Sequence, residues 1–177
     1  MRTLLLKSLF ARPVTVRPPE PSDAALAEVG HALEQRVRRL LGRSMTIREV
    51  DAGSCNGCEL EIHALNNAIY DVERFGLRFA ASPRHADALL VTGPVTHNMK
   101  VALERTYAAM PDPKWVIAVG DCAAGCGVFE GSYAIVGAVE KVVPVDLHIR
   151  GCPPRPIDLL RGLIALIDKA TVPVASK

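Results

Sequence analysis

Apolar residues in the first part of the chain follow a helical period between Ser22 and Gly42. They recur every three or four positions, at Leu26, Val29, Leu33, Val37 and Leu40. This spacing places them on one face of a helix that Ser22 can begin as N-cap and that Gly42 can end. The opposite face is basic toward its C-terminal end, where cations also suit the helix dipole. We predict an amphipathic helix that packs on its own domain or docks on a membrane-embedded partner or a lipid surface.

The segment before this helix, residues 1–21, has no regular period. Its short apolar runs are interrupted by Pro13, Pro18, Pro19 and Pro21. Because prolines disfavour helix at the positions that precede them, we expect an extended or irregular arm. Lys7 breaks the first apolar run and no small-residue cleavage site follows, so we expect no signal peptide and a cytoplasmic chain.

After Gly42 the pattern changes to short runs of β-prone residues that alternate with helical stretches. The expected strands cover residues 45–50, 77–80, 88–92, 114–120 and 141–145. The expected helices cover residues 59–72, 98–109 and 156–170. This alternation predicts an α/β fold with a mostly parallel sheet and helices on both faces. We therefore expect an N-terminal arm and amphipathic helix in residues 1–44 and one α/β domain in residues 45–177.

Composition and charge limit the classes of protein to which the chain can belong. The 177 residues are 49% apolar, which is enough for a core that needs no disulfides. The longest stretch without charged residues, 88–99, is 12 residues long, short of the roughly 18 that suggest a membrane span, so we expect no transmembrane helix. The net charge is +2, but residues 1–44 hold eight Lys or Arg against four Asp or Glu. Without interleaved aromatics, this basic head favours an acidic partner or anionic lipid over nucleic acid.

Four of the five cysteines come after the carboxyl ends of expected strands. Cys55 and Cys58 follow the first strand, Cys122 follows the most apolar strand, and Cys152 follows the last one. Stretches of 63 and 29 residues separate the pair from Cys122 and Cys122 from Cys152. In an open parallel sheet these strand ends share one edge, where ligand crevices form. We therefore expect the four thiols to converge on one pocket.

Converging cysteines in a reducing compartment are better suited to hold a metal or cluster than to form disulfides. Structural zinc sites usually show two C-x2-C pairs, whereas here one pair joins two isolated cysteines. An iron–sulfur cluster accepts this spacing, and Cys152 followed by Pro153 is typical of the last ligand in ferredoxin-type motifs. The spacing favours an iron–sulfur cluster, with zinc or unligated structural or redox thiols as the alternatives.

Seven short motifs stand in a fixed order in the second part of the chain. They are Gly53–Glu59, Asp71–Gly76, Ser82–Asp87, Val91–Thr96, Gly120–Cys122, Val143–Asp146 and Gly151–Pro156. In this order they resemble the complex I 20 kDa subunit family, which includes the small subunit of membrane-bound energy-converting (group 4, formate hydrogenlyase-type) [NiFe] hydrogenases. The resemblance covers about residues 45–168. It implies a flavodoxin-like fold and one [4Fe-4S] cluster whose ligands are Cys55, Cys58, Cys122 and Cys152.

Within this family the first cysteine motif differs between branches. Complex I members carry two adjacent cysteines there, whereas hydrogenase small subunits carry C-x-x-C followed by Glu. The chain has the hydrogenase form in Cys55, Cys58 and Glu59. The resemblance thus implies an oxidoreductase subunit that exchanges electrons in proton reduction or H2 oxidation; the alternative is a complex I-like NADH:quinone oxidoreductase subunit that passes electrons to quinone. Cys126 departs from the family, which usually has the first glycine of a Gly-Gly pair at this position.

The resemblance also implies the partners of the chain. The cluster lies against a large subunit that holds the [NiFe] centre or, in complex I, half of the quinone cavity, so the chain alone should be inactive. Other iron–sulfur subunits and integral membrane subunits complete the complex, which implies a peripheral position on the cytoplasmic side of the inner membrane. Glu59 is expected either to cap the helix that it begins or to act as a catalytic proton-relay or interface carboxylate near the partner's active site.

Overall fold

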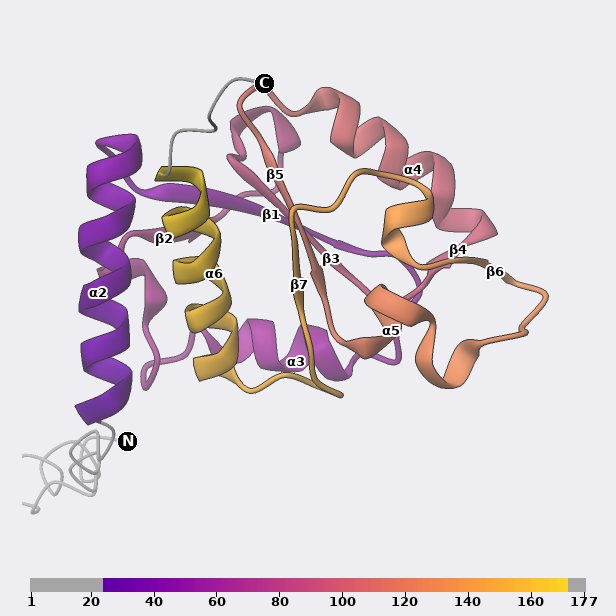
Figure 1. Cartoon of the computed structure of the whole chain (residues 1–177), viewed down its shortest axis with the longest axis horizontal. Helices are drawn as coiled ribbons and strands as arrows, with labels where there is room; N and C mark the ends of the chain where they lie inside the picture. The colour runs from indigo at the N-terminus through magenta and orange to yellow at the C-terminus, as the bar shows by residue number, and fades with distance from the viewer. Residues whose placement is uncertain (1–23, 172–177) are drawn as a thin grey trace, which may run out of the picture.

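The structure, a computed structural model, describes residues 24–171, and its centre is a five-stranded parallel sheet (Figure 1). The strands are β1 (Met45–Asp51), β2 (Leu77–Phe79), β3 (Ala88–Thr92), β5 (Trp115–Val119) and β7 (Leu147–Ile149). They lie in the order β2-β1-β3-β5-β7, and every neighbouring pair is parallel. Counted within this sheet the order is 2-1-3-4-5, the flavodoxin-like arrangement. The predicted α/β fold is confirmed.

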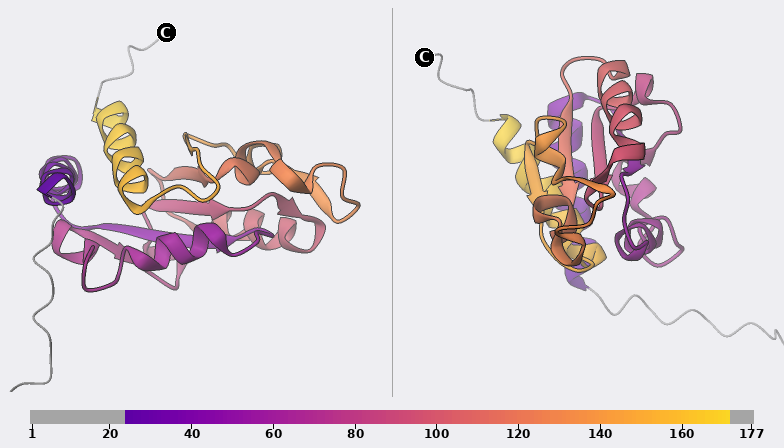
Figure 2. Two further views of the ribbon diagram at one scale, coloured as in Figure 1. Left: turned by 90° about the horizontal axis from the view of Figure 1, so that it is seen from below. Right: turned by 90° about the vertical axis from the view of Figure 1, so that its right-hand side faces the viewer.

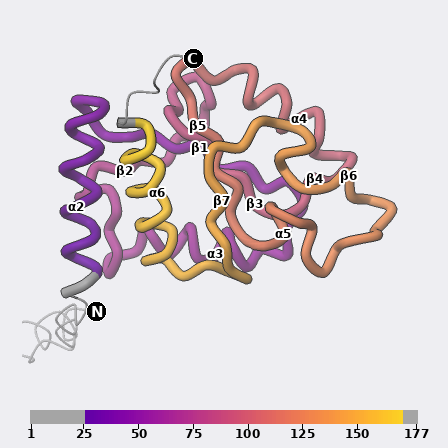
Figure 3. Tube along the Cα trace, in the orientation of Figure 1, coloured from indigo at the N-terminus to yellow at the C-terminus, as the bar shows by residue number. Residues whose placement is uncertain are grey.

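Helices cover both faces of this sheet, as predicted. The α-helices are α2 (Ala24–Leu41), α3 (Gly57–Ala64), α4 (His97–Ala109), α5 (Asp121–Gly125) and α6 (Pro156–Thr171). Side chains of α2, α3 and α6 share one apolar core, and side chains of α4 and α5 belong to a second one. Figures 2 and 3 show α2 and α6 side by side, in agreement with their many contacts. None of the helices within residues 24–171 is long and apolar enough to span a membrane.

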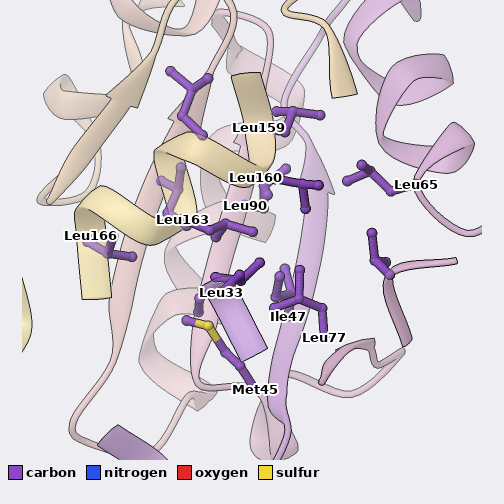
Figure 4. Close-up of a cluster of buried hydrophobic side chains, with 14 of the residues drawn as sticks. Leu33, Met45, Ile47, Leu65, Leu77, Leu90, Leu159, Leu160, Leu163 and Leu166 are labelled. Carbon is purple, nitrogen blue, oxygen red and sulfur yellow. The ribbon is translucent and has the colours of Figure 1, made fainter. Parts of the chain in front are cut away.

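The two cores follow from the alternation of side chains along buried strands. All five residues of β3 are buried, as expected for the central strand of a parallel sheet. Leu90 packs into the core under α2, α3 and α6, whereas its neighbour Leu89 packs into the core under α4. Figure 4 shows Leu90 among Leu33 of α2, Ile47 of β1 and side chains of α6. Burial of one such leucine stabilises the fold by about 2 kcal/mol relative to its exposure.

The predicted N-terminal amphipathic helix is present as α2 and packs on the sheet-containing domain. Leu33 and Val37 of its apolar face are almost completely buried. From the polar side, Arg36 Nε donates a hydrogen bond of 2.7 Å to Asp168 Oδ1 of α6. The predicted arm and the Ser22 N-cap lie outside the described residues. The division of the chain at residue 44 stays a prediction.

The prediction of a last strand at residues 141–145 is wrong. This stretch forms the end of a 3-10 helix and a loop, and β7 begins only at Leu147. Val143 nevertheless is buried in the core under α4, so the apolar run reflects a loop that fills the core. Asp146 then fixes the start of β7: its N–H donates to Val116 O at 2.9 Å, and its Oδ2 accepts the Val116 N–H at 2.7 Å. Pro144 has no N–H to donate to a neighbouring strand.

The expected helix at residues 59–72 is also too long, because α3 ends at Ala64. After it, Asn67 Oδ1 accepts the N–H groups of Ile69 and Tyr70 at 2.8 and 2.9 Å. An asparagine side chain that bonds nearby backbone in this way competes with helix formation. The turn therefore replaces the last two turns of the expected helix.

Several short elements have no counterpart in the sequence pattern. They are α5, the 3-10 helices η1 (Val72–Phe75), η2 (Pro83–His85), η3 (Gly127–Phe129) and η4 (Val139–Lys141), and the antiparallel strands β4 (Val95–Thr96) and β6 (Ile135–Gly137). Elements of two to five residues are too short to produce a hydrophobic period.

Candidate functional site

The connections that carry the cysteines leave the carboxyl edge of the sheet and meet there. Cys55 lies in the loop from β1, Cys58 in the first turn of α3, Cys122 in α5 after β5, and Cys152 in the loop from β7 to α6. Figures 1 and 3 show α3, α5 and the β7–α6 loop at this one edge. The connections converge as the sequence predicted, although the strand before Cys152 is β7 and not residues 141–145.

Two glycines let sulfur atoms approach the neighbouring backbone. A Cβ atom at Gly120 would lie 2.7 Å from Cys58 Sγ, and a Cβ atom at Gly127 would lie 2.8 Å from Cys122 Sγ. Their φ angles are 90° and 52°, in the region that favours glycine. The Cβ position at Gly120 is also 3.6 Å from the carbonyl oxygen of Gly151. Cys58 therefore lies next to the β5–α5 connection, which itself touches the loop that carries Cys152.

Backbone hydrogen bonds hold these last two connections together. The Gly120 N–H donates to Ile149 O at 2.8 Å, and the Asp121 N–H donates to Gly151 O at 2.9 Å. In return, the Gly151 N–H donates to Asp121 Oδ1 at 3.3 Å. The positions of Cys122 and Cys152 are thus coupled through main-chain atoms.

The thiols influence one another electrostatically. Burial, followed by the negative charges of Glu59 and of the Cys55, Cys122 and Cys152 thiolates, raises the pKa of Cys58 to about 12. Burial also raises the pKa of Cys122, and the Cys152 thiolate raises it further. Both shifts favour the protonated form of the two thiols. A metal group that binds here must displace those protons, so its binding depends on pH.

All five cysteines are free thiols. Cys55 and Cys152 are exposed, whereas Cys58, Cys122 and Cys126 are partly buried. No three Cys, His, Asp or Glu side chains within residues 24–171 are arranged around a point that a single metal ion would occupy. The fit of the site to a metal group therefore rests on its four-thiol donor set and on the space that Gly120 and Gly127 leave beside two of the sulfurs.

The loop that carries Cys55 is ordered by short-range hydrogen bonds. Asp51 Oδ1 accepts the N–H groups of Gly53 and Ser54, both at 2.8 Å. The Ala52 N–H donates to Thr92 O at 3.0 Å, and Ala52 O accepts the Thr96 N–H at 2.9 Å. These bonds fasten the loop from β1 to the turn that follows β3.

Glu59 is a buried carboxylate beside the thiols. It is 6% exposed, and its Oε1 accepts a hydrogen bond of 2.6 Å from the Ser54 hydroxyl. Its other oxygen, Oε2, is buried and has no hydrogen-bond partner in the described part of the chain. Its partner is thus a side-chain hydroxyl and not a backbone N–H of α3, and the N-cap residue Asn56 makes no side-chain capping bond either.

A pocket of about 450 Å³ adjoins Glu59, between α3 and the ends of β1 and β2. Glu49 lines it too, with Oε1 buried and unpartnered among the described residues and Oε2 3.9 Å from His63 Nε2. Burial raises the pKa of Glu49, and the nearby His63 lowers it in part. Sequence reasoning missed Glu49 and His63. The only signal for Glu49 was a charged residue late in an expected strand, and no feature of the pattern singled out His63.

Cys126 is placed next to this site by the backbone. Its φ is 64°, and its N–H donates to Cys122 O at 2.8 Å. A left-handed conformation explains why the resembling family usually has glycine at this position. Arg155, in the loop after Cys152, bonds the first turn of α6. Its Nε donates to Asp158 Oδ2 at 2.9 Å, and this bond lowers the pKa of the Asp158 carboxyl.

Comparison with known proteins gives consistent matches. A family model described as "NADH ubiquinone oxidoreductase, 20 Kd subunit" matches residues 55–166. The chain is 45% identical over 140 residues to a probable membrane-bound hydrogenase subunit of Pyrococcus furiosus, covering 77% of this chain and 84% of that protein. It is 42% identical over 144 residues to formate hydrogenlyase subunit 7 of Escherichia coli, covering 81% of this chain but only 55% of the relative.

Two further matches are to a protein named for a different function and to a solved structure of similar fold. The chain is 46% identical over 112 residues to a subunit of the NADH-quinone oxidoreductase of Citrifermentans bemidjiense, covering 63% of this chain and 65% of that protein. In a solved structure titled "Structure of the membrane-bound sulfane sulfur reductase (MBS), an archaeal respiratory membrane complex", one chain matches with a TM-score of 0.67 and 34% identity, over 81% of this chain and 78% of that one. The names of the relatives confirm the predicted oxidoreductase class, and both predicted functions occur among them.

Proposed function

Because the chain belongs to the family of the NADH ubiquinone oxidoreductase 20 kDa subunit, we propose that it is the electron-transfer subunit of a membrane-associated, hydrogenase-like complex. It carries one [4Fe-4S] cluster on Cys55, Cys58, Cys122 and Cys152. The cluster exchanges electrons with the active site of a large partner subunit, where protons are reduced or H2 is oxidised.

One observation carries this proposal: three separate connections bring four thiols to one edge of the sheet, with glycine beside two of the sulfurs. Four thiolates are the usual donor set of an iron–sulfur cluster. Gly120 and Gly127 leave no side chain between the sulfurs and the backbone. The mutual effect of the thiols on their pKa values supports the same grouping.

When bound, the cluster supplies one-electron chemistry. The chain's own residues set its surroundings. Cys58 and Cys122 lie partly buried against the sheet edge, which limits their reorganisation, whereas Cys55 and Cys152 are exposed at the rim. We propose that this exposed rim faces the partner subunit. Without that partner the chain has no substrate-converting centre, so it is inactive alone.

Glu59 belongs to the partner-facing side of this proposal. Its unpartnered Oε2 and its position on the pocket beside α3 support a role as a relay or contact carboxylate toward the partner's active site. The Ser54 hydroxyl holds the other oxygen in place. Ser54 is thus a positioning residue for Glu59.

The other proposed partners are further iron–sulfur subunits and integral membrane subunits. Names of relatives such as "membrane-bound hydrogenase subunit" support such an assembly. In it the chain binds peripherally, on the cytoplasmic side of the inner membrane. The exposed basic end of α2, with Arg38 and Arg39, is a suitable contact for an acidic partner or anionic lipid.

A second function, electron transfer to quinone, is favoured by two matches to complex I proteins. Residues 55–166 match the complex I family model, and a subunit of an NADH-quinone oxidoreductase is 46% identical to the chain. The C-x-x-C-Glu form of Cys55, Cys58 and Glu59 and the 84% coverage of the Pyrococcus furiosus relative favour the hydrogenase.

Anaerobic isolation of the native complex through a tag on this chain tests the proposal. We expect iron, nickel in the large subunit, and H2 production from reduced methyl viologen. Quinone reduction without nickel would replace the hydrogenase by the second function. A complex without iron would overturn both, because each needs the cluster.

A further inference from the structure

Thr92, the last residue of β3, has a hydroxyl group without a partner. The residue is completely buried, with 0% of its surface exposed. Its Oγ1 makes no hydrogen bond to any atom in the described part of the chain. Buried hydroxyl groups are almost always hydrogen-bonded, because leaving one unpaired in a low-dielectric interior is costly. Thr92 therefore calls for an acceptor that is not part of residues 24–171.

The register of the sheet places Thr92 between the cysteine-bearing connections. Thr92 pairs with Asp51 on one side and with Val119 on the other. The loop with Cys55 begins just after Asp51, and the connection to Cys122 begins just after Val119. Thr92 is thus the central residue of the sheet edge at which the four thiols meet.

The side-chain alternation of β3 assigns Thr92 to the face that bears Cys58. Leu90 packs into the core under α3 and α6, and Thr92, two residues further, faces the same side. Cys58 packs against this same core. Its sulfur lies over Gly120, which directly follows the strand partner of Thr92. The Thr92 side chain and the Cys58 sulfur therefore lie on the same face of the sheet at its carboxyl end, beside the adjacent residues Val119 and Gly120.

Backbone acceptors near Thr92 are already in use. Thr92 O accepts the Ala52 N–H, and Ile149 O accepts the Gly120 N–H. Glu59 Oε2 is a further buried acceptor at this edge without a partner among the described residues, but it makes no hydrogen bond with Thr92 Oγ1. We propose that the Thr92 hydroxyl donates a hydrogen bond to a sulfide of the bound cluster and thereby raises the reduction potential of the cluster. This inference rests on the proposed function.

The direction of the effect follows from charge. Reduction adds one negative charge to the cluster and its thiolates, and a hydrogen-bond donor to sulfur stabilises that charge. Removal of the donor therefore makes reduction less favourable. The shape of the site changes little when threonine is replaced by valine, because the two side chains differ only in the exchange of the hydroxyl for a methyl group.

The test is a redox titration of the native complex, followed by electron paramagnetic resonance of the reduced cluster. We expect Thr92→Val and Thr92→Ala to shift the midpoint potential to more negative values and Thr92→Ser to restore it toward the wild-type value. Thr46→Val is the matched control, because Thr46 is also a buried strand residue but lies at the opposite end of the sheet. This control should leave the potential unchanged.

A second readout is independent of the potential. In the wild type, electron–nuclear double resonance should detect a proton that couples to the reduced cluster and exchanges in D2O, and this coupling should disappear in Thr92→Val and remain in Thr92→Ser. A cluster signal with an unchanged potential and an unchanged exchangeable coupling in both Thr92→Val and Thr92→Ala would overturn the inference alone. A wild-type complex without any cluster signal would overturn the proposed function instead.

Discussion

The two ends of the central sheet differ in whether their buried polar atoms have hydrogen-bond partners within the described residues. At the amino end, Asp87 accepts hydrogen bonds from the Thr46 N–H at 2.8 Å and from both Nη atoms of Arg43. At the carboxyl end, Thr92 Oγ1 and Glu59 Oε2 are buried without a partner among residues 24–171. Both ends belong to the same parallel strands, so the difference does not come from the architecture.

This difference distinguishes residues that stabilise the fold from residues that are available to a cofactor or a partner subunit. Asp87 and Asp146 join the starts of neighbouring strands, and all the bonds they need come from within the chain. The carboxyl end instead holds glycines, free thiols and unpaired polar atoms that a cofactor or a partner subunit can satisfy. We therefore expect substitutions at the amino end to change stability and those at the carboxyl end to change cluster content.

Cys58→Ser should have the largest effect at the carboxyl end. Loss of one thiolate from the ligand set removes most of the cluster on this chain, so the isolated complex should lose about four iron ions per chain and the paramagnetic signal of this cluster, while the iron of the other subunits remains. Cys126→Ser is the control, because Cys126 is outside the proposed ligand set and should retain full iron content. Normal iron in Cys58→Ser would refute the ligand assignment.

Gly127→Ala should reduce cluster content more strongly than Gly131→Ala. Both glycines have a positive φ, of 52° and 79°, so both substitutions carry the backbone cost of roughly 1 kcal/mol. Only the alanine at Gly127 would clash with a sulfur, that of Cys122; Gly131 has open space around its Cβ position. Iron per folded chain measures the difference, and equal losses in the two variants would contradict the role of the sulfur contact.

Asp87→Ala should destabilise the amino end without affecting the cluster. It leaves the buried Thr46 N–H without its side-chain acceptor, which should lower the free energy of unfolding by about 2 kcal/mol. Arg43→Ala should cost less than about 1 kcal/mol, because the Arg43 side chain is largely exposed. Thermal melting and iron content of the same samples check both expectations. A loss of iron in the folded Asp87→Ala protein would erase the contrast between the two ends.

Glu49→Gln should have the smallest effect, and one that depends on pH. Burial raises the pKa of Glu49, so the folded chain holds this proton more tightly than the unfolded chain. The stability that this proton contributes is complete below the unfolded pKa of about 4.3 and is lost as the pH rises through the higher folded value. Glu49→Gln should therefore gain stability relative to the wild type as the pH rises. Melting curves recorded over this pH range measure the effect, with the exposed Glu130→Gln as control. The same dependence of stability on pH in both variants would contradict the expectation.

The hydrophobic pattern predicted the centre of the molecule well. Residues 88–92 form a strand as expected, because a continuous apolar run bounded by polar residues is typical of a fully buried strand. The convergence of the cysteines was predictable for a related reason, since parallel strands present their carboxyl ends at one edge. An error of a few residues in the last strand did not change on which edge Cys152 lies.

Other features depend on contacts that no local pattern encodes. β7 has only three residues, and its position is fixed by the bonds between Asp146 and Val116 and not by its own hydrophobicity. The buried oxygens of Glu49 and Glu59 become neighbours of one pocket only when α3 folds over β1. The close approach of Gly120 to Cys58 likewise joins residues from two different connections.

The most direct measurement is the iron and acid-labile sulfide content of the anaerobically isolated complex, with the other iron–sulfur subunits removed or counted separately. One cubane on this chain predicts about four iron and about four sulfide ions per chain, in a state that a single electron reduces. Stoichiometric zinc in place of iron, or iron without labile sulfide, would contradict the proposal that these four thiols hold a cluster.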